Sequence, residues 1–290
     1  MEYKLSNGKI HLIVSSHGAE LQSVKKDNIE YLWDGNEEYW PDRAPVLFPF
    51  VGRFTEGKYT LNGKTFEMDI HGFAKQSDFQ LVEQKQDKLI LELRDSEKTI
   101  ACYPFCFKLN VEYHLKENVI DIRFVVENCS EETMYFGIGG HPGFRVPLEK
   151  ELSFSDYMLE FGGESRPERV GHTDQCFLSG KDEEFVLEDG KILRLEHSLF
   201  DEDAIVLRNM SDEVTLRSNK GKRKVTVKYP DCRYLGIWHA PKTKAGYVCI
   251  EPWTSIPSRQ DIIEEFRYKS DLIRLNPDET YVNQWSISIE

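Results

Sequence analysis

The stretch that decides the fold is FKLNVEYHLKENVIDIRFVVEN (107–128). Apolar and polar residues alternate along both halves of it, as expected for strands with one buried face. We therefore predict two strands, 107–115 and 118–128. Only Lys116 and Glu117 lie between them, and Asn118 can adopt a turn conformation, so the two strands are expected to form a hairpin.

The same alternation recurs along the chain, in KIHLIVSS (9–16), KLILELRD (88–95), DAIVLRN (203–209), EVTLRS (213–218) and KVTVKY (224–229). Helical periodicity is scarce. Segments 37–45 and 258–273 are polar and irregular, and only the second could hold a short helix. No internal repeat and no Pro/Gly/Ser-rich linker is visible. The chain is predicted to be a large antiparallel all-β protein with one domain spanning residues 1–290.

One motif resembles a phosphate-binding loop but has the wrong spacing. GKYTLNGKT (57–65) reads G-x5-G-K-T, whereas the P-loop requires four residues between the glycines. Asn62-Gly63 is a favoured pair at a two-residue type I′ turn. We predict a β-hairpin here.

Composition and charge exclude several classes of protein. The chain has 290 residues, with 37 Lys and Arg against 50 Asp and Glu, a formal net charge of −13. Nucleic-acid and anionic-lipid binding both depend on clustered basic residues, so neither partner is expected. Hydrophobic residues make up 40% of the chain, enough for a sizeable core, and no apolar run is long enough to span a membrane. Since no secretory signal is visible, we expect a soluble cytoplasmic protein.

Six cysteines are scattered along the chain, at positions 102, 106, 129, 176, 232 and 249. The only close pair has a C-x3-C spacing within an aromatic, strand-like segment. We predict reduced, buried cysteines rather than disulfides or metal ligands.

Two histidines occupy Gly- and Phe-rich surroundings that a plain β core does not require. His71 lies in DIHGFAKQSDF (69–79) and His141 in YFGIGGHPGF (135–144). A third segment, APVLFPFVGRFTEG (44–57), ends its apolar run in Gly-Arg-Phe. Glycine lets a ligand approach the backbone closely. A lone histidine in such a context is more often structural, but two together make a ligand site an even alternative.

A fourth segment places a carboxylate at the end of an apolar strand. GYVCI (246–250) leads into Glu251, Pro252 and Trp253. An apolar surrounding that excludes water is expected to raise the pKa of Glu251, which suits a general base near neutral pH. A strand-end glutamate that caps a loop is the alternative.

Motifs of several other chemistries are missing. The chain has no G-x-S-x-G, no H-E-x-x-H, no G-x-G-x-x-G and no C-x-x-C. The chemistry that remains is acid–base catalysis by histidine and carboxylate side chains beside aromatic surfaces.

Four short motifs in order, GRF, HGFA, GGHPGF and CIEPW, resemble the aldose 1-epimerase (galactose mutarotase-like) family, nearest its bacterial branch close to the hexose-6-phosphate 1-epimerases. The resemblance covers nearly the whole chain. It implies a β-supersandwich of antiparallel strands with few short helices and a sugar cleft. It also implies an isomerase that interconverts the anomers of a hexose without metal or other cofactor.

The resemblance also assigns roles to residues. Glu251 matches the general base, His141 the general acid and His71 the second active-site histidine. Arg53 matches the arginine of the cleft. Asp203 is our choice for the sugar-binding aspartate, with Asp201 as a close competitor.

The resemblance implies a neutral hexose or a hexose phosphate as the substrate. Where the phosphate branch has arginine after HGFA, this chain has Lys75, which with Arg43 and Arg53 leaves a phosphosugar open. We rank a free aldohexose first and add Trp253 as a substrate-contacting surface. The alternatives are a carbohydrate-binding module and a glycoside hydrolase or lyase that uses Glu251 with Asp203. The oligomeric state stays open.

The segment 158–182 is a polar, Gly-rich loop. Its Arg166 and His172 could reach a ligand or face water, and we expect them to face water.

Overall fold

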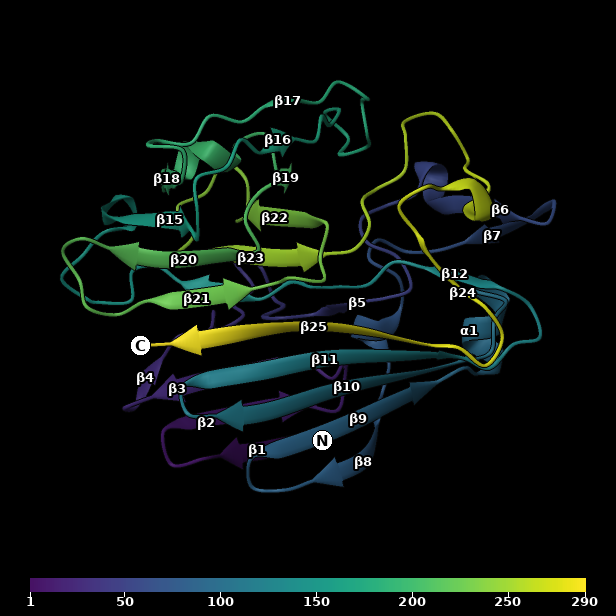
Figure 1. Ribbon diagram of the computed structural model, residues 1–290, viewed down its shortest axis with the longest axis horizontal. Coiled ribbons are helices and arrows are strands. Elements are labelled where there is room, and N and C mark those ends of the chain that lie inside the picture. Colours follow the sequence, from purple (N-terminus) through teal and green to yellow (C-terminus); the bar gives the residue numbers. More distant parts are fainter.

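Antiparallel strands dominate the computed structural model, which describes residues 1–290 (Figure 1). The largest sheet has nine strands. Their order is β18 (Ile192–Arg194), β15 (Tyr157–Phe161), β20 (Glu213–Ser218), β21 (Val225–Lys228), β25 (Thr280–Ile289), β11 (Val119–Asn128), β10 (Phe107–Lys116), β9 (Lys88–Arg94), β8 (Gln80–Gln84). The predicted all-β class is confirmed.

A second large sheet carries three of the four segments that the sequence analysis singled out, all except DIHGFAKQSDF (69–79). Its order is β17 (Glu183–Glu184), β16 (Glu168–Arg169), β19 (Ile205–Arg208), β22 (Tyr234–Trp238), β23 (Tyr247–Trp253), β13 (Gly139–Gly140), β5 (Val46–Leu47), with β14 (Gly143–Arg145) also pairing with β23. Strand β23 is therefore central, with partners on both sides.

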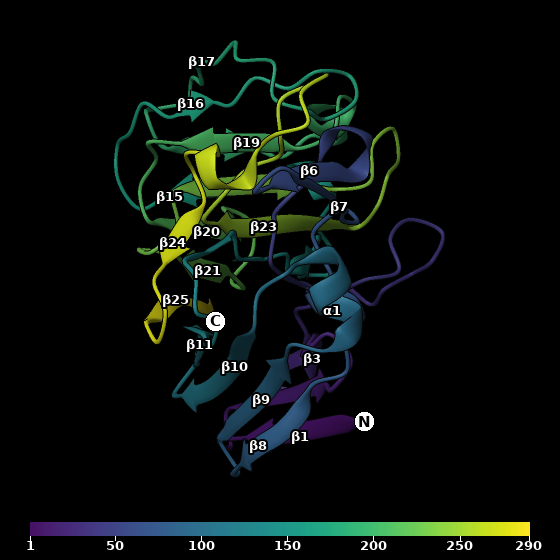
Figure 2. The same ribbon diagram turned by 90° about the vertical axis from the view of Figure 1, so that its right-hand side faces the viewer.

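Three smaller sheets complete the fold. One has four strands in the order β1 (Glu2–Ser6), β2 (Ile10–Ser15), β3 (Leu21–Lys26), β4 (Ile29–Glu30). The others pair β6 (Lys58–Leu61) with β7 (Lys64–Glu67) and β12 (Met134–Phe136) with β24 (Ile273–Leu275). Figures 1 and 2 show the four-stranded sheet lying against the β8–β11 part of the nine-stranded sheet.

The core lies between these layers. Strands β10 and β11 alternate buried and part-buried residues along their whole length, because successive side chains of a strand point to opposite faces. A cluster of 65 buried residues joins the inner faces. Tyr113 of β10 donates from its hydroxyl to the carbonyl of Ala19 at 2.7 Å, which ties the nine-stranded sheet to the N-terminal strands.

Both predicted hairpins are present. Strands β6 and β7 are joined by Asn62 and Gly63, with φ of 53° and 75°, as a type I′ turn requires. In the β10–β11 hairpin Lys116 pairs with Val119, so the turn residues are Glu117 and Asn118, and Glu117 has φ 53°. The turn therefore lies one residue later than predicted.

Helices are few and short. The one α-helix is α1 (Glu97–Cys102), and the 3-10 helices are η1 (Thr55–Gly57), η2 (Ala74–Gln76), η3 (Phe154–Asp156), η4 (His197–Phe200) and η5 (Phe266–Tyr268). The expectation that 258–273 holds a short helix is met only by the single turn η5. Ser96 and Thr99 form a capping box that starts α1. No helix is long and apolar enough to cross a membrane.

All six cysteines are free. The prediction that they are buried is wrong for most of them: Cys249 is buried, three are part-buried, and Cys106 and Cys129 are exposed. The two exposed cysteines lie where strands end, so the sheet interior does not cover them.

Candidate active site

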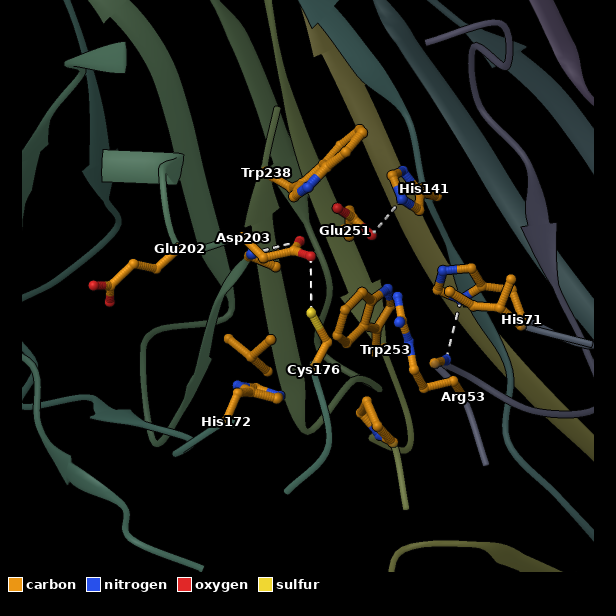
Figure 3. Close-up of a pocket in the computed structure, with 15 residues that line it drawn as sticks. Arg53, His71, His141, His172, Cys176, Glu202, Asp203, Trp238, Glu251 and Trp253 are labelled. Atoms are coloured by element: carbon orange, nitrogen blue, oxygen red, sulfur yellow. Dashed lines mark hydrogen bonds and ion pairs between the residues drawn. The ribbon is translucent and has the colours of Figure 1, made fainter. Parts of the chain in front are cut away.

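Strand β23 places Glu251 at the base of a cavity of about 140 Å³ (Figure 3). Every residue of the strand is buried, and Glu251 is 1% exposed. Residues two apart point to the same face of a strand, so Cys249, Glu251 and Trp253 share one face. Glu251 and Trp253 line the cavity.

His141 faces the Glu251 carboxylate. It follows β13, and its backbone N–H donates to the carbonyl of Pro45 at 3.1 Å. Its Nε2 lies 3.1 Å from Oε2 of Glu251, and the residue is 8% exposed. The ring of Trp40 lies over His141 with centroids 4.8 Å apart, and Trp238 meets it edge-on at 5.7 Å. Aromatic packing therefore fixes the imidazole against the carboxylate.

Burial acts on both members of this pair. It raises the pKa of Glu251 well above its ordinary value, with a smaller contribution from the charge of Asp203. Burial lowers the pKa of His141 to about 3. Both shifts disfavour the charged forms. Burial alone therefore favours a protonated Glu251 beside a neutral His141.

His71 forms a second imidazole wall. Its backbone N–H donates to the carbonyl of Gly52 at 2.7 Å, and its Nδ1 accepts from the Gly52 N–H at 3.0 Å. The neutral ring then carries its proton on Nε2. Burial lowers the pKa of His71 well below its usual range. The rings of His71 and His141 meet edge-on with centroids 5.7 Å apart.

The backbone conformation, as well as the chemistry of the side chain, explains the sequence of the HGF motif. His71 and Gly72 both adopt left-handed conformations, with φ of 65° and 72°. A Cβ at Gly72 would lie 2.3 Å from the carbonyl oxygen of Phe48. Only glycine fits this position, and its conformation turns the chain so that His71 points into the cavity (Figure 3).

This geometry predicts a difference between two glycine variants. Gly63 has a similar φ of 75°, but nothing lies within 4 Å of the point that a Cβ would occupy there. Gly63→Ala is expected to lower the free energy of unfolding by about 1–2 kcal/mol from the backbone conformation alone. Gly72→Ala adds a clash with fixed backbone and should cost about 1–3 kcal/mol more. Urea denaturation of both variants measures the difference, and equal losses would contradict the clash.

The structure brings most of the predicted site residues together. Arg53, His71, His141, Asp203, Glu251 and Trp253 all line the cavity. The Arg53 guanidinium has no carboxylate partner within 4 Å in the chain. Asp203 lies at the opposite side of the cavity from His71 (Figure 3).

Three other charged candidates lie elsewhere. Lys75 does not line the cavity and instead pairs with Asp42 at 3.3 Å. Arg43 donates from Nη1 to the carbonyl of Gln22 at 2.6 Å. Asp201 is exposed and does not line the cavity. Lys75 and Arg43 are held away from the cavity by these partners, and Asp201 by the direction of its loop.

The sequence analysis did not assign three further cavity residues to the site. Trp238 lies at the end of β22, beside Cys249 in register, and lines the cavity. Cys176 and His172 reach it from the loop between β16 and β17. The expectation that His172 faces water is wrong, because its loop folds back over the cavity. Arg166 does not line the cavity. The sequence around Trp238 resembles any buried strand and carries no signal of its own.

One group of side chains has the donor types that a metal ion accepts. Ligand atoms of His141, Cys249 and Glu251 lie within 4.8 Å of one another. Zn²⁺ binds such donors when the thiol is ionised. Burial raises the pKa of the Cys249 thiol well above its ordinary value, which opposes its ionisation. The set is therefore better suited to proton transfer than to metal binding.

Comparison with known proteins assigns the family. The model of the family described as aldose 1-epimerase matches residues 1–288. This chain belongs to the aldose 1-epimerase family. The resemblance seen in the motifs is thereby confirmed, and the chain is an isomerase of a family that acts on sugars.

Relatives of known sequence and structure agree with this assignment. The chromosomal protein LacX of Lactococcus lactis subsp. lactis is 31% identical over 298 residues, which cover 100% of this chain and 99% of LacX. A galactose mutarotase related enzyme from Lactobacillus acidophilus is 35% identical, with a TM-score of 0.95 and coverage of 100% and 97%. A galactose mutarotase-like protein from Lactobacillus casei ATCC 334 is 28% identical, with a TM-score of 0.95 over both whole chains. The predicted galactose mutarotase-like β-sandwich is confirmed.

Proposed function

We propose that this family member interconverts the α and β anomers of a neutral aldohexose. The observation that carries the proposal is a buried carboxyl, Glu251, 3.1 Å from the buried imidazole of His141 at the base of a sugar-sized cavity. Mutarotation needs one group that takes a proton and one that gives a proton on neighbouring oxygens. A pair that holds one proton between its members provides both.

In the proposed reaction Glu251 takes the proton of the anomeric O1 hydroxyl while protonated His141 donates its proton to the ring oxygen. The bond between C1 and the ring oxygen breaks, and O1 becomes the carbonyl oxygen of an open-chain aldehyde. Rotation about C1–C2 presents the other face of the carbonyl. Reclosure with reversed proton transfers gives the opposite anomer and restores both groups, so the reaction needs neither metal nor other cofactor.

This scheme requires the ion-pair form of Glu251 and His141, whereas burial alone favours the uncharged form. The two forms differ only in the position of one proton between atoms 3.1 Å apart. A sugar hydroxyl that donates to the carboxylate and a ring oxygen that accepts from the imidazolium both stabilise the charged form. Trp40, stacked on His141, adds a favourable contact to a cationic ring.

The remaining cavity residues are proposed to bind the sugar. Nε2–H of His71 and the guanidinium of Arg53 are donors to sugar oxygens, and Asp203 accepts from a hydroxyl. Trp253 offers an apolar face. The Nδ1 of His141 is buried without a hydrogen-bond partner, so a sugar hydroxyl is its expected partner.

The charge distribution favours a neutral sugar over a hexose phosphate. Of the three cations considered for a phosphate, only Arg53 lines the cavity, while Lys75 pairs with Asp42 and Arg43 with a backbone carbonyl. Asp203 and Glu202 add carboxylates to the same lining. One cation among these groups is a poor match for a phosphate dianion.

Polarimetry tests the proposal. Freshly dissolved α-D-galactose and α-D-glucose should approach equilibrium faster with enzyme than without it. Exchange NMR measures the same acceleration with glucose 6-phosphate and galactose 6-phosphate. Acceleration confined to these two sugars would mean that the substrate is a phosphosugar and not a neutral sugar. Binding without exchange would favour a carbohydrate-binding protein, and release of new reducing ends from a disaccharide would favour a hydrolase.

The pKa shifts predict the pH dependence of kcat/KM. On the acid side, activity is lost when the pair gains a second proton, and the lowered pKa of His141, about 3, places this far below the ordinary histidine range. On the alkaline side, activity is lost when the pair loses its proton, above the raised pKa of Glu251. The enzyme-dependent rate should therefore not fall as the pH is lowered from about 6.5 to about 5. A tenfold fall per pH unit below 6.5 would contradict this protonation scheme.

A further inference from the structure

The loop between β16 and β17 is folded into a compact hairpin at one side of the cavity. His172 and Leu178 form a bridge, and the Ser179 N–H donates to the carbonyl of Gly171 at 2.9 Å. The Leu178 N–H donates to the carbonyl of Ser258 at 2.9 Å, beyond the end of β23. The loop is thus attached to the segment that follows the strand of Glu251.

Cys176 lies at the tip of this hairpin and points into the cavity. Its N–H donates to the carbonyl of Thr173 at 2.8 Å, and its φ of 62° is left-handed. This turn brings Sγ to 2.9 Å from Oδ2 of Asp203, and both residues line the cavity (Figure 3).

Asp203 is held from two sides. Its own backbone is left-handed, with φ 79°, and its Oδ1 accepts from the N–H of Ala204 at 2.8 Å. Its Oδ2 accepts from the Cys176 thiol. A carboxylate oxygen can accept two hydrogen bonds, so each oxygen keeps a position for a sugar hydroxyl. Without the thiol, only the bond to the adjacent Ala204 N–H would fix the carboxylate.

The thiol is suited to donate at neutral pH. Burial raises the pKa of Cys176 to about 12, and the carboxylate of Asp203 contributes to the same shift. The sulfur therefore keeps its proton, and the contact is a hydrogen bond from S–H to a carboxylate.

We propose that Cys176 is a positioning residue of the sugar site, whose thiol holds the Asp203 carboxylate facing the cavity so that it can accept a hydroxyl of the substrate. This inference rests on the proposed function, in which Asp203 binds the sugar. Cys176 acts on binding and not on proton transfer, because its thiol bonds to Asp203, whereas Glu251 and His141 are held by β23 and by the segment after β13.

The test separates KM from kcat in a set of variants assayed with galactose or glucose. Cys176→Ala removes the donor, and KM should rise about 3- to 10-fold with kcat within about twofold, the range expected for one typical hydrogen bond. Cys176→Ser keeps a donor and should recover most of the loss. Cys106→Ala, at an exposed position, serves as the matched control and should match the wild type.

A double-mutant cycle tests whether the effect passes through Asp203. In an Asp203→Asn background, Cys176→Ala should have little further effect on KM. The proposal would be overturned if the effects of Cys176→Ala and Asp203→Asn on KM multiplied. An unchanged KM in Cys176→Ala, or a fall of its kcat alone, would also overturn it. Titration of each variant with sugar, monitored by tryptophan fluorescence, gives dissociation constants that can be compared in the same way as KM. If the wild type binds sugar but does not accelerate exchange, the proposed function fails while the role of Cys176 is still measured.

Discussion

Replacing Glu251 by glutamine is expected to lower kcat for mutarotation by about 10²- to 10⁴-fold, or about 3–5 kcal/mol of transition-state stabilisation. Glutamine has nearly the same shape but cannot exchange a proton with O1 or with His141. Because Glu251 is 1% exposed, bulk solvent does not take over its role. Polarimetry or magnetisation-transfer NMR on galactose measures the loss.

The fold and the binding site should survive this change. The amide has nearly the same shape as the protonated carboxyl that burial favours, so the free energy of unfolding should not fall. The dissociation constant for sugar, from tryptophan fluorescence, should stay within several-fold of the wild type. Asp201→Asn is the matched control, since it neutralises an exposed carboxylate that does not line the cavity. Undiminished turnover in a folded Glu251→Gln protein would remove Glu251 from the mechanism.

The sheet architecture could be predicted because apolar and polar residues alternate along each strand. Strands β10 and β11 each bury every second residue, and a period of two has no other common interpretation. The helix α1 could not be predicted this way, since six residues are too few to show a helical period. Its signal was the capping box of Ser96 and Thr99, which is a weaker pattern.

The residues of the candidate active site likewise differ in whether a local sequence pattern marks them. His71, His141 and Glu251 stand in short motifs whose glycines and prolines the backbone itself requires, so they can be found in the sequence. Trp40 cannot, because it comes from a polar, irregular segment and stacks on His141 only through the tertiary fold. Cys176 depends likewise on a loop whose conformation is set by bonds to residues distant in sequence, such as the Asp203 carboxylate.

The charge of Lys75 illustrates a related limit. The sequence places this lysine just after the HGFA motif, which leaves a phosphate contact open. In the fold, Asp42 lies 3.3 Å from its amino group and offers a closer partner than the cavity does. Sequence spacing gives the distance along the chain, whereas the choice between two partners depends on how loops meet in space.

Replacing His141 by glutamine is expected to lower kcat by about 10²- to 10⁴-fold as well. The amide can still form hydrogen bonds near the position of Nε2 but cannot deliver a proton to the ring oxygen. His17→Gln is the matched control, since His17 is an exposed histidine that pairs only with Asp78. The control should retain full activity, and its loss would point to a general effect of the substitution.

The double variant His141→Gln with Glu251→Gln decides whether the two residues act as one unit. If a single proton serves both transfers, removing either group disables the relay, and removing both should cost little more than the worse single change. If each group acted separately, the two losses would multiply to about 10⁴- to 10⁸-fold. The 3.1 Å contact between Nε2 and Oε2 favours the first result. Multiplying losses would mean that the two groups act independently and do not share one proton.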